Sequence, residues 1–97
     1  MIVERRTHKT KPFCEQETAD LCKEIWTVFG ASNVVRIYRH ISGPENVVYQ
    51  EFEFRDWQER EQYWAGVYAR PEMPEWSERW KELTESGGNI EFLGLVE

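Results

Sequence analysis

The residues best suited to chemistry lie on two strand-like stretches that flank a predicted turn. Arg36, Tyr38 and His40 alternate along the first stretch. Tyr49 and Glu51 alternate along the second. Hydroxyl, imidazole and carboxylate groups on adjacent strands could converge on a small polar ligand or activate an oxygen-bearing substrate. We therefore regard Tyr38, His40 and Tyr49 as candidate catalytic residues, although burial against a second copy of the chain explains the same pattern with fewer assumptions.

Aromatic side chains in the second half of the chain form another candidate site. The chain holds five Trp among 97 residues, which is more bulk than the packing of so small a core usually requires. Aromatic residues recur at helical spacings in this part of the chain, and Tyr63 and Trp76 are two of them. The candidate ligand-binding residues are Trp57, Trp64, Tyr68 and Trp80. These side chains could line a cavity for a flat apolar ligand. Aromatic stripes on helices are also common as plain core, and that alternative stays open.

The standard catalytic and cofactor motifs are absent from the sequence. No metal-ligand spacing, glycine-rich phosphate loop, nucleophile elbow or paired-cysteine motif occurs, so we expect no metal and no cofactor. His8 and His40 are single residues on strands, for which an ordinary hydrogen-bonded role is the simpler interpretation. Cys14 and Cys22 lie eight residues apart on one predicted helix, about 12 Å along its axis, which exceeds the reach of a disulfide. We expect both to be free packing residues.

The net charge and hydropathy of the chain disfavour some classes of binding partner. A formal net charge of −6 disfavours nucleic acid, because phosphate binding requires clustered Lys and Arg. No window approaches the length of a membrane span, and no apolar leader follows Met1, so we expect a cytoplasmic protein that does not enter a membrane. The length suits a single domain, residues 1–97.

Hydrophobic periodicity predicts seven elements. The predicted strands span residues 2–10, 34–41, 47–54 and 90–96. The predicted helices span residues 13–29, 56–70 and a third segment that begins at Pro74 and ends at Gly87-Gly88. Asp56 and Glu59 have the spacing of a capping box, and Gly30 is the expected end of the first helix.

The order of these elements predicts the fold class. It follows β, α, β, β, α with a broken extension, then β, which matches the ferredoxin-like α+β topology. The usual spatial solution is a four-stranded antiparallel sheet with its helices on one face and the other face uncovered. Glu4 and Arg6, on one side of the first strand, are expected to form a structural ion pair.

Alternation along the predicted hairpin sorts its side chains between the two faces. Those expected to face the helices are Val35, Ile37, Ile41, Val48, Phe52 and Phe54. Those expected on the uncovered face are Val34, Arg36, Tyr38, His40, Val47, Tyr49, Glu51 and Glu53. Valines and tyrosines with Arg and Glu in cross-strand reach suit a surface buried against a second copy. We predict a homodimer through this face, which includes Arg36, Tyr38, Tyr49 and Glu51. The alternative is a monomer in which exposed Tyr and Val side chains are simply tolerated.

Three short motifs resemble those of a known family. Residues 1–12 read MIVERRTHKTKP and are similar to the start of NIPSNAP-like domains. Residues 42–48, SGPENVV, resemble the hairpin of these domains, and Arg70-Pro71-Glu72 before Trp76 resembles the segment between their last helices. The sequence departs from the family at Phe13, where a glycine is common. The resemblance implies membership of the dimeric α+β barrels, in which two sheets form a barrel and enzymatic members have a pocket between sheet and helices.

Two functions from different classes follow. The leading hypothesis is a dimeric domain that binds a small aromatic or apolar molecule between its sheet and helices, or that serves only as an assembly unit. The alternative is a cofactor-independent monooxygenase or isomerase that uses the same pocket with Tyr38, His40 and Tyr49. Without a cofactor, oxygen chemistry requires the substrate itself to supply the electrons.

Overall fold

The structure, a computed structural model, describes residues 1–29 and 35–96. Its strands are β1 (Ile2–Thr10), β2 (Val35–Arg39), β3 (Val47–Phe54) and β4 (Thr84–Gly94). Its helices are α1 (Glu15–Phe29), α2 (Trp57–Tyr68) and α3 (Met73–Leu83). Gly30 and Val34 lie outside the described residues.

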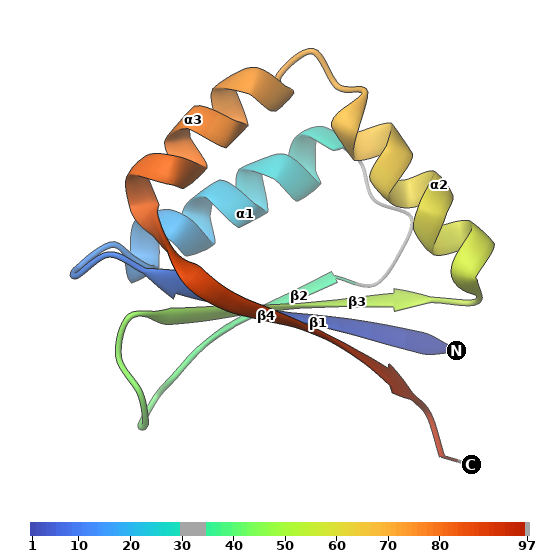
Figure 1. Cartoon of the computed structure of the whole chain (residues 1–97), viewed down its shortest axis with the longest axis horizontal. Coiled ribbons are helices and arrows are strands. Elements are labelled where there is room, and N and C mark those ends of the chain that lie inside the picture. The colour runs from blue at the N-terminus through green and yellow to red at the C-terminus, as the bar shows by residue number, and fades with distance from the viewer. Residues whose placement is uncertain (30–34, 97) are drawn as a thin grey trace.

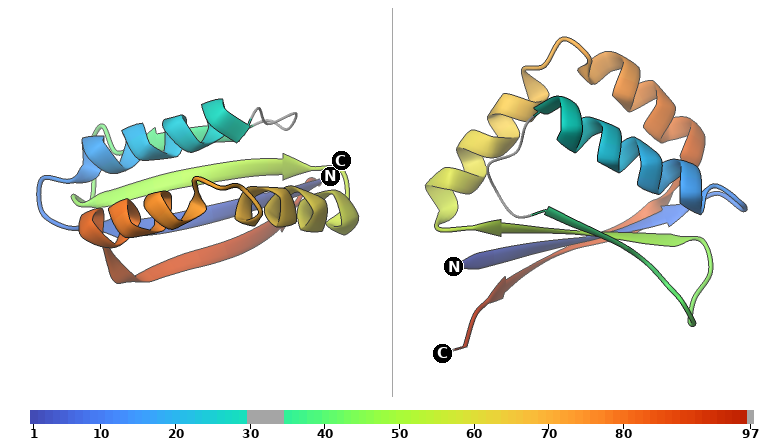
Figure 2. Two further views of the ribbon diagram at one scale, coloured as in Figure 1. Left: turned by 90° about the horizontal axis from the view of Figure 1, so that it is seen from above. Right: turned by 180° about the vertical axis from the view of Figure 1, so that it is seen from behind.

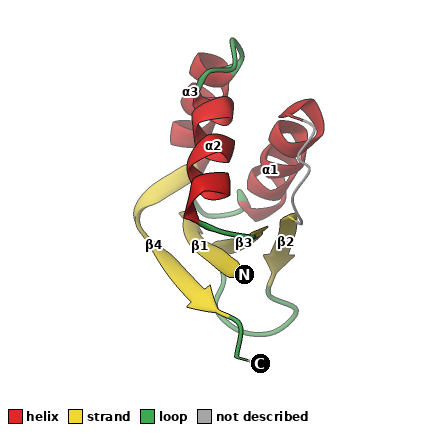
Figure 3. Cartoon of the chain, turned by 90° about the vertical axis from the view of Figure 1, so that its right-hand side faces the viewer, coloured by secondary structure: helices red, strands yellow, loops and turns green. Residues whose placement is uncertain are grey.

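The strands form one antiparallel sheet in the order β2-β3-β1-β4. Helices α1, α2 and α3 lie on the same side of it, and no described helix covers the other side, called the uncovered face below (Figure 1 and Figure 3). Seen from above, α1 lies over one half of the sheet, while α2 and α3 lie end to end over the other half (Figure 2). The predicted ferredoxin-like α+β fold is confirmed.

Alternating burial along β3 separates the two faces of the sheet. Its even-numbered residues, Val48 to Phe54, are buried, and its odd-numbered residues are partly exposed. Phe52 and Phe54 pack with Tyr63 and Val67 of α2 in the core. The predicted helix-facing side of β3 is therefore confirmed, because a strand directs successive side chains to opposite faces.

Local signals in the sequence account for where two helices begin. Asp56 caps α2 by accepting a hydrogen bond from the backbone N–H of Glu59 at 2.8 Å. The Glu59 carboxylate binds Arg55 instead of returning to the cap, so only half of the predicted capping box forms. Pro74 lies in the first turn of α3, where its missing N–H removes no helical hydrogen bond.

Two boundaries differ from the prediction. The third helix ends at Leu83, and Gly87-Gly88 lie inside β4 instead of ending the helix. Pairing with β1 extends this strand to Thr84, so tertiary contacts override the local preference of the two glycines. Ile41 is fully exposed beyond the end of β2, so its predicted place against the helices is wrong.

Phe13 has a left-handed backbone, with φ of 65°. This region favours glycine, since other residues have a Cβ that crowds the backbone there. The position is the one at which the NIPSNAP-like pattern commonly has glycine. The phenyl group itself is 97% exposed, so packing does not account for its presence.

Candidate functional site

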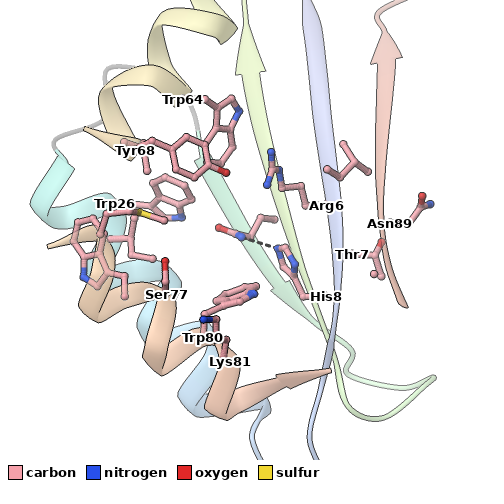
Figure 4. Close-up of a pocket in the computed structure, with 17 residues that line it drawn as sticks. Arg6, Thr7, His8, Trp26, Trp64, Tyr68, Ser77, Trp80, Lys81 and Asn89 are labelled. Carbon is pink, nitrogen blue, oxygen red and sulfur yellow. Dashed lines mark hydrogen bonds between the residues drawn. The ribbon is translucent and has the colours of Figure 1, made fainter. Parts of the chain in front are cut away.

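A cavity of about 740 Å³ lies between the sheet and the helices (Figure 4). Its walls come from β1, α1, β3, α2, α3 and β4. The helix-side lining is mostly apolar and comprises Ile25, Trp26, Trp64, Val67, Tyr68, Met73, Trp76, Ser77, Trp80 and Lys81. The sheet-side lining is mostly polar and comprises Arg6, Thr7, His8, Gln50, Gly88, Asn89 and Ile90. The volume lies within the range of small-molecule sites.

Aromatic rings interlock along the helix side of the cavity. Trp26 of α1 meets Trp64 of α2 edge to face, with ring centroids 6.2 Å apart. Trp64 in turn contacts Tyr68, with centroids 6.1 Å apart. Trp76 is buried, and its indole N–H donates to Glu24 at 3.2 Å. Such contacts hold the rings in defined positions, so they present flat, rigid surfaces to the cavity.

The polar side of the cavity centres on His8 and Gln50. Their side-chain nitrogens are 2.7 Å apart, a bond in which the Gln50 amide donates to the imidazole (Figure 4). His8 also packs edge to face on Trp80, with centroids 4.6 Å apart. Burial, with the nearby charge of Arg6, lowers the pKa of His8 to about 4, so its imidazole is neutral at physiological pH. A neutral ring is what the bond from Gln50 requires.

One acceptor on this side has no partner among the described residues. Gln50 is 5% exposed, and its carbonyl oxygen Oε1 makes no hydrogen bond within the part of the chain that the structure describes. A buried amide oxygen without a partner is unfavourable by about 1–3 kcal/mol. A ligand in the cavity that donated an N–H or O–H would satisfy it.

Glu4 anchors Arg6 behind the cavity. This carboxylate is fully buried, and its two oxygens accept from Arg6 at 2.5 Å, Arg60 at 2.7 Å and the Trp64 indole at 3.2 Å. Burial by itself would raise the pKa of Glu4, but the hydrogen bonds from Arg60, Arg6 and Trp64 outweigh it and hold that pKa below its usual range. The predicted Glu4–Arg6 ion pair is confirmed.

Gly88 brings β4 close to β1 at the edge of the cavity. A Cβ at this position would lie 2.5 Å from the carbonyl oxygen of Thr7, closer than real Cβ contacts. The β1–β4 pairing shifts register here, between Thr7 and Lys9. The absence of a side chain at residue 88 is thus a requirement of this backbone path.

Three of the four predicted ligand-binding aromatics line the cavity. Trp64, Tyr68 and Trp80 contribute to its wall (Figure 4). Trp57 does not line the cavity, because it lies at the start of α2 and is 53% exposed. Its ring packs on Phe92 instead, with ring centroids 5.0 Å apart.

The predicted catalytic candidates lie on the other face of the sheet. Tyr38 pairs directly with Tyr49 across β2 and β3, and neither residue lines the cavity. The Tyr49 hydroxyl binds His40 Nε2 at 2.7 Å, and the Tyr38 hydroxyl donates to Glu51 at 3.3 Å. The expectation that these three residues serve a pocket beneath the helices is wrong within one chain, because strand alternation directs them away from it.

The same uncovered face carries two cross-strand ion pairs. Arg36 binds Glu53 at 2.8 Å, and Arg5 of β1 binds Glu51 at 2.8 Å. The predicted pairing of Arg and Glu on this face is confirmed, with Glu53 as the partner of Arg36. The Tyr38 hydroxyl also binds Glu51, the partner of Arg5.

Sequence reasoning missed most of the cavity lining, including Arg6, His8, Trp26 and Gln50. Arg6 and His8 follow Glu4 at every second position of β1, and this alternation was the available signal that all three share the helix-facing side. Trp26 follows Cys22 by four residues on the buried side of α1. Only the pairing of β1 with β3 sets Arg6 and His8 beside Gln50.

The structure also bears on the predictions for the cysteines, a metal site and a membrane span. Cys14 and Cys22 are both free, and burial raises the pKa of the Cys22 thiol to about 12, which keeps it protonated. Within residues 1–29 and 35–96, no group of three or more His, Cys, Asp or Glu side chains could hold a metal ion. None of the helices in this part of the chain is both long and apolar enough to cross a membrane.

Comparison with solved structures reveals the same fold in several proteins. An uncharacterized NIPSNAP domain protein from Burkholderia xenovorans matches with a TM-score of 0.83 at 18% identity, over 99% of this chain and 95% of that one. A NIPSNAP family protein of unknown function from Agrobacterium tumefaciens matches with a TM-score of 0.79 at 18% identity, over 96% and 86%. An antibiotic biosynthesis monooxygenase matches with a TM-score of 0.73 at 11% identity, over 100% of both chains.

Neither a family model nor a curated protein matches the sequence. Sequence identities of 11–18% to these structures establish a shared fold and no shared activity. The chain has the ferredoxin-like fold of solved NIPSNAP domain proteins, and this confirms at the level of structure the resemblance that residues 1–12 and 42–48 indicated.

Proposed function

We propose that the chain binds one small, flat, apolar or aromatic molecule in the cavity between its sheet and its helices. The observation that carries this proposal is the cavity of about 740 Å³ with four tryptophans in its wall. The cavity is partly open to solvent, and its aromatic wall is buried more favourably against an apolar ligand than against water.

The polar side of the cavity suits a ligand with one hydrogen-bond donor. Gln50 Oε1 is buried without a partner among the described residues, and the Trp26 indole nitrogen is in the same position. Both residues line the cavity. An apolar ring system with an N–H or O–H group would fill the aromatic space and satisfy Gln50 at once.

Binding can be tested with N-phenyl-1-naphthylamine, an uncharged aromatic amine whose fluorescence rises in apolar surroundings. We expect saturable binding of one molecule per chain. Ser77→Trp should weaken it at least about tenfold, because Ser77 lines the cavity on α3 and an indole there would occupy the space of the ligand (Figure 4). The variant Ser86→Trp is the matched control, since Ser86 is exposed on β4 outside the lining. No saturable binding by the wild-type protein, or equal weakening by both variants, would refute the proposal.

We also infer that the chain forms a homodimer through the uncovered face of the sheet. Support comes from the mixed character of this face, where apolar Val3, Val47 and Leu93 accompany Tyr38, Tyr49 and the ion pairs Arg5–Glu51 and Arg36–Glu53. Apolar side chains combined with ion pairs that set the register are typical of interfaces between copies.

Sedimentation equilibrium tests the dimer. We expect wild-type protein to be dimeric in the micromolar range and Tyr38→Glu to be monomeric, because the new carboxylate would lie beside Glu51 and bring unpaired negative charge from each copy into the interface. Phe13→Glu is the control, since it adds the same charge at a fully exposed loop position. A wild-type monomer at all these concentrations would contradict the inference.

An enzymatic use of the cavity is the second candidate. The chain would then be the cofactor-independent monooxygenase or isomerase of the sequence analysis, and the observation that favours it is the likeness in fold to an antibiotic biosynthesis monooxygenase. Within the cavity the neutral imidazole of His8 could accept a proton only after Gln50 releases its Nε2, and a pKa of about 4 makes it a weak base. Oxygen uptake with a bound aromatic substrate, lost in Ser77→Trp, would support this candidate over binding alone.

A further inference from the structure

We propose that the ligand of this cavity is an aromatic acid, whose anionic group binds the guanidinium of Arg6 while its rings lie against the tryptophans. This inference rests on the proposed function and adds the charge of the ligand to it. Three observations carry it: the charge of the cavity lining, the free donors of Arg6, and the position of Arg6 beside Trp64.

The lining of the cavity has a charge opposite to that of the whole chain. The chain carries a formal net charge of −6. Among the described residues that line the cavity, none is Asp or Glu, whereas Arg6 and Lys81 are both cations. A cationic lining in an acidic protein attracts an anion to this one site and leaves the rest of the surface repulsive to it.

Arg6 retains unused hydrogen-bond donors at the cavity. Its Nε donates to Glu4, and its two terminal nitrogens donate to no group in residues 1–29 and 35–96. Glu4 is shared with Arg60, so one carboxylate faces two guanidiniums and the cluster keeps a net positive charge. The side chain of Arg6 is only 18% exposed, where a charge-assisted bond is stronger than in open water.

The geometry also aligns the acidic group with the rings of the ligand. The central carbon of the Arg6 guanidinium lies 4.0 Å from the centroid of the Trp64 ring. Figure 4 shows Arg6 extending from β1 toward Trp64, with Trp26 and Tyr68 beyond. If the acidic group of the ligand binds the free edge of this guanidinium, the aromatic rings of the ligand lie among these aromatic side chains. Glu4 and Trp64 hold the guanidinium in place before the ligand arrives.

A matched pair of probes separates this inference from the proposed function. 8-Anilinonaphthalene-1-sulfonate is N-phenyl-1-naphthylamine with an added sulfonate, so the two share ring system and N–H and differ in one anionic group. We expect the wild-type protein to bind the sulfonate about tenfold more tightly than the uncharged amine, and to lose this preference as salt increases. Saturable binding with mutual competition identifies the cavity as the shared site.

The variant Arg6→Gln should weaken binding of the sulfonate about tenfold more than it weakens binding of the uncharged amine, so that the preference for the anion is lost. Arg6→Lys should recover part of the preference, because it keeps the charge and loses the planar donor pair. Arg36→Gln is the control, since it changes the net charge equally on the uncovered face. Circular dichroism and the thermal midpoint establish that each variant is folded.

The two proposals fail in different ways. Equal wild-type affinity for both probes would overturn the aromatic-acid inference and leave the proposed function intact. The same holds if Arg36→Gln weakens sulfonate binding as much as Arg6→Gln does. Failure of the wild-type protein to bind either probe would overturn both. If Arg6→Gln does not fold, the wild-type preference and its salt dependence decide the question alone.

Discussion

The variant Glu4→Gln is expected to unfold with a free energy about 3 kcal/mol below that of the wild-type protein. Glu4 is fully buried on β1 and accepts hydrogen bonds from Arg6, Arg60 and Trp64. An amide of nearly the same shape removes the negative charge and leaves two guanidiniums close together without a counterion. Breaking a buried ion pair from one side is strongly destabilising for this reason. Urea denaturation followed by tryptophan fluorescence measures the loss.

Glu59→Gln is the matched control for this experiment. It removes an ion pair with Arg55 on the surface of α2, where Arg55 is 89% exposed, so its effect should stay below about 1 kcal/mol. An equal loss in the two variants would show that Glu4 does not act as the counterion of the two arginines. The low pKa of Glu4 also predicts that its contribution is present above its unfolded pKa and is lost as the pH falls through its folded pKa.

Between pH 7 and pH 5, the free energy of unfolding is expected to fall by about 2 kcal/mol because of His8. Burial and the charge of Arg6 lower its folded pKa to about 4 from an ordinary value of 6.5. Within this window the unfolded chain binds a proton at residue 8 and the folded chain does not, so acidification favours unfolding. Carboxylates with unfolded pKa values near 4.5 contribute little until the pH is lower. Urea titrations at both pH values give the difference.

In His8→Asn this pH dependence should largely disappear, whatever the stability of the variant at pH 7. His40→Asn is the control, because it removes the only other histidine of the chain, which is exposed on the far side of the sheet. A wild-type slope that persists in His8→Asn would mean that another group causes it. Loss of the slope in His40→Asn instead would assign the titration to the uncovered face.

Much of the fold was predictable because it depends on short-range periodicity. Alternation along β3 correctly placed Val48, Phe52 and Phe54 against the helices. Local chemistry also marked the start of α2 at Asp56. The boundary at Gly87-Gly88 was not predictable in this way, because pairing of β4 with β1 decides it. Local preference is a weak guide where long-range hydrogen bonds compete with it.

The candidate site was predictable only in part. Trp64, Tyr68 and Trp80 were identified as ligand-binding candidates from spacing alone, and all three line the cavity. Trp57 belongs to the same helical stripe and yet lies outside, because the start of α2 is beyond the reach of the cavity. Periodicity assigns a side chain to a face of its element and does not say what covers that face.

By itself, the sequence determined the elements, their order and the two faces of the central strands, since these follow from residue spacing along one chain. The tertiary structure decided which side chains meet. The strand order β2-β3-β1-β4 sets His8 beside Gln50, 42 residues away, and the docking of α2 sets Arg60 on Glu4, 56 residues away. A cavity depends on such contacts between distant segments, which no local pattern records. The tyrosine and histidine candidates of the hairpin were separated from the tryptophans for the same reason: a sheet has two faces, and this one has its cavity on only one of the two.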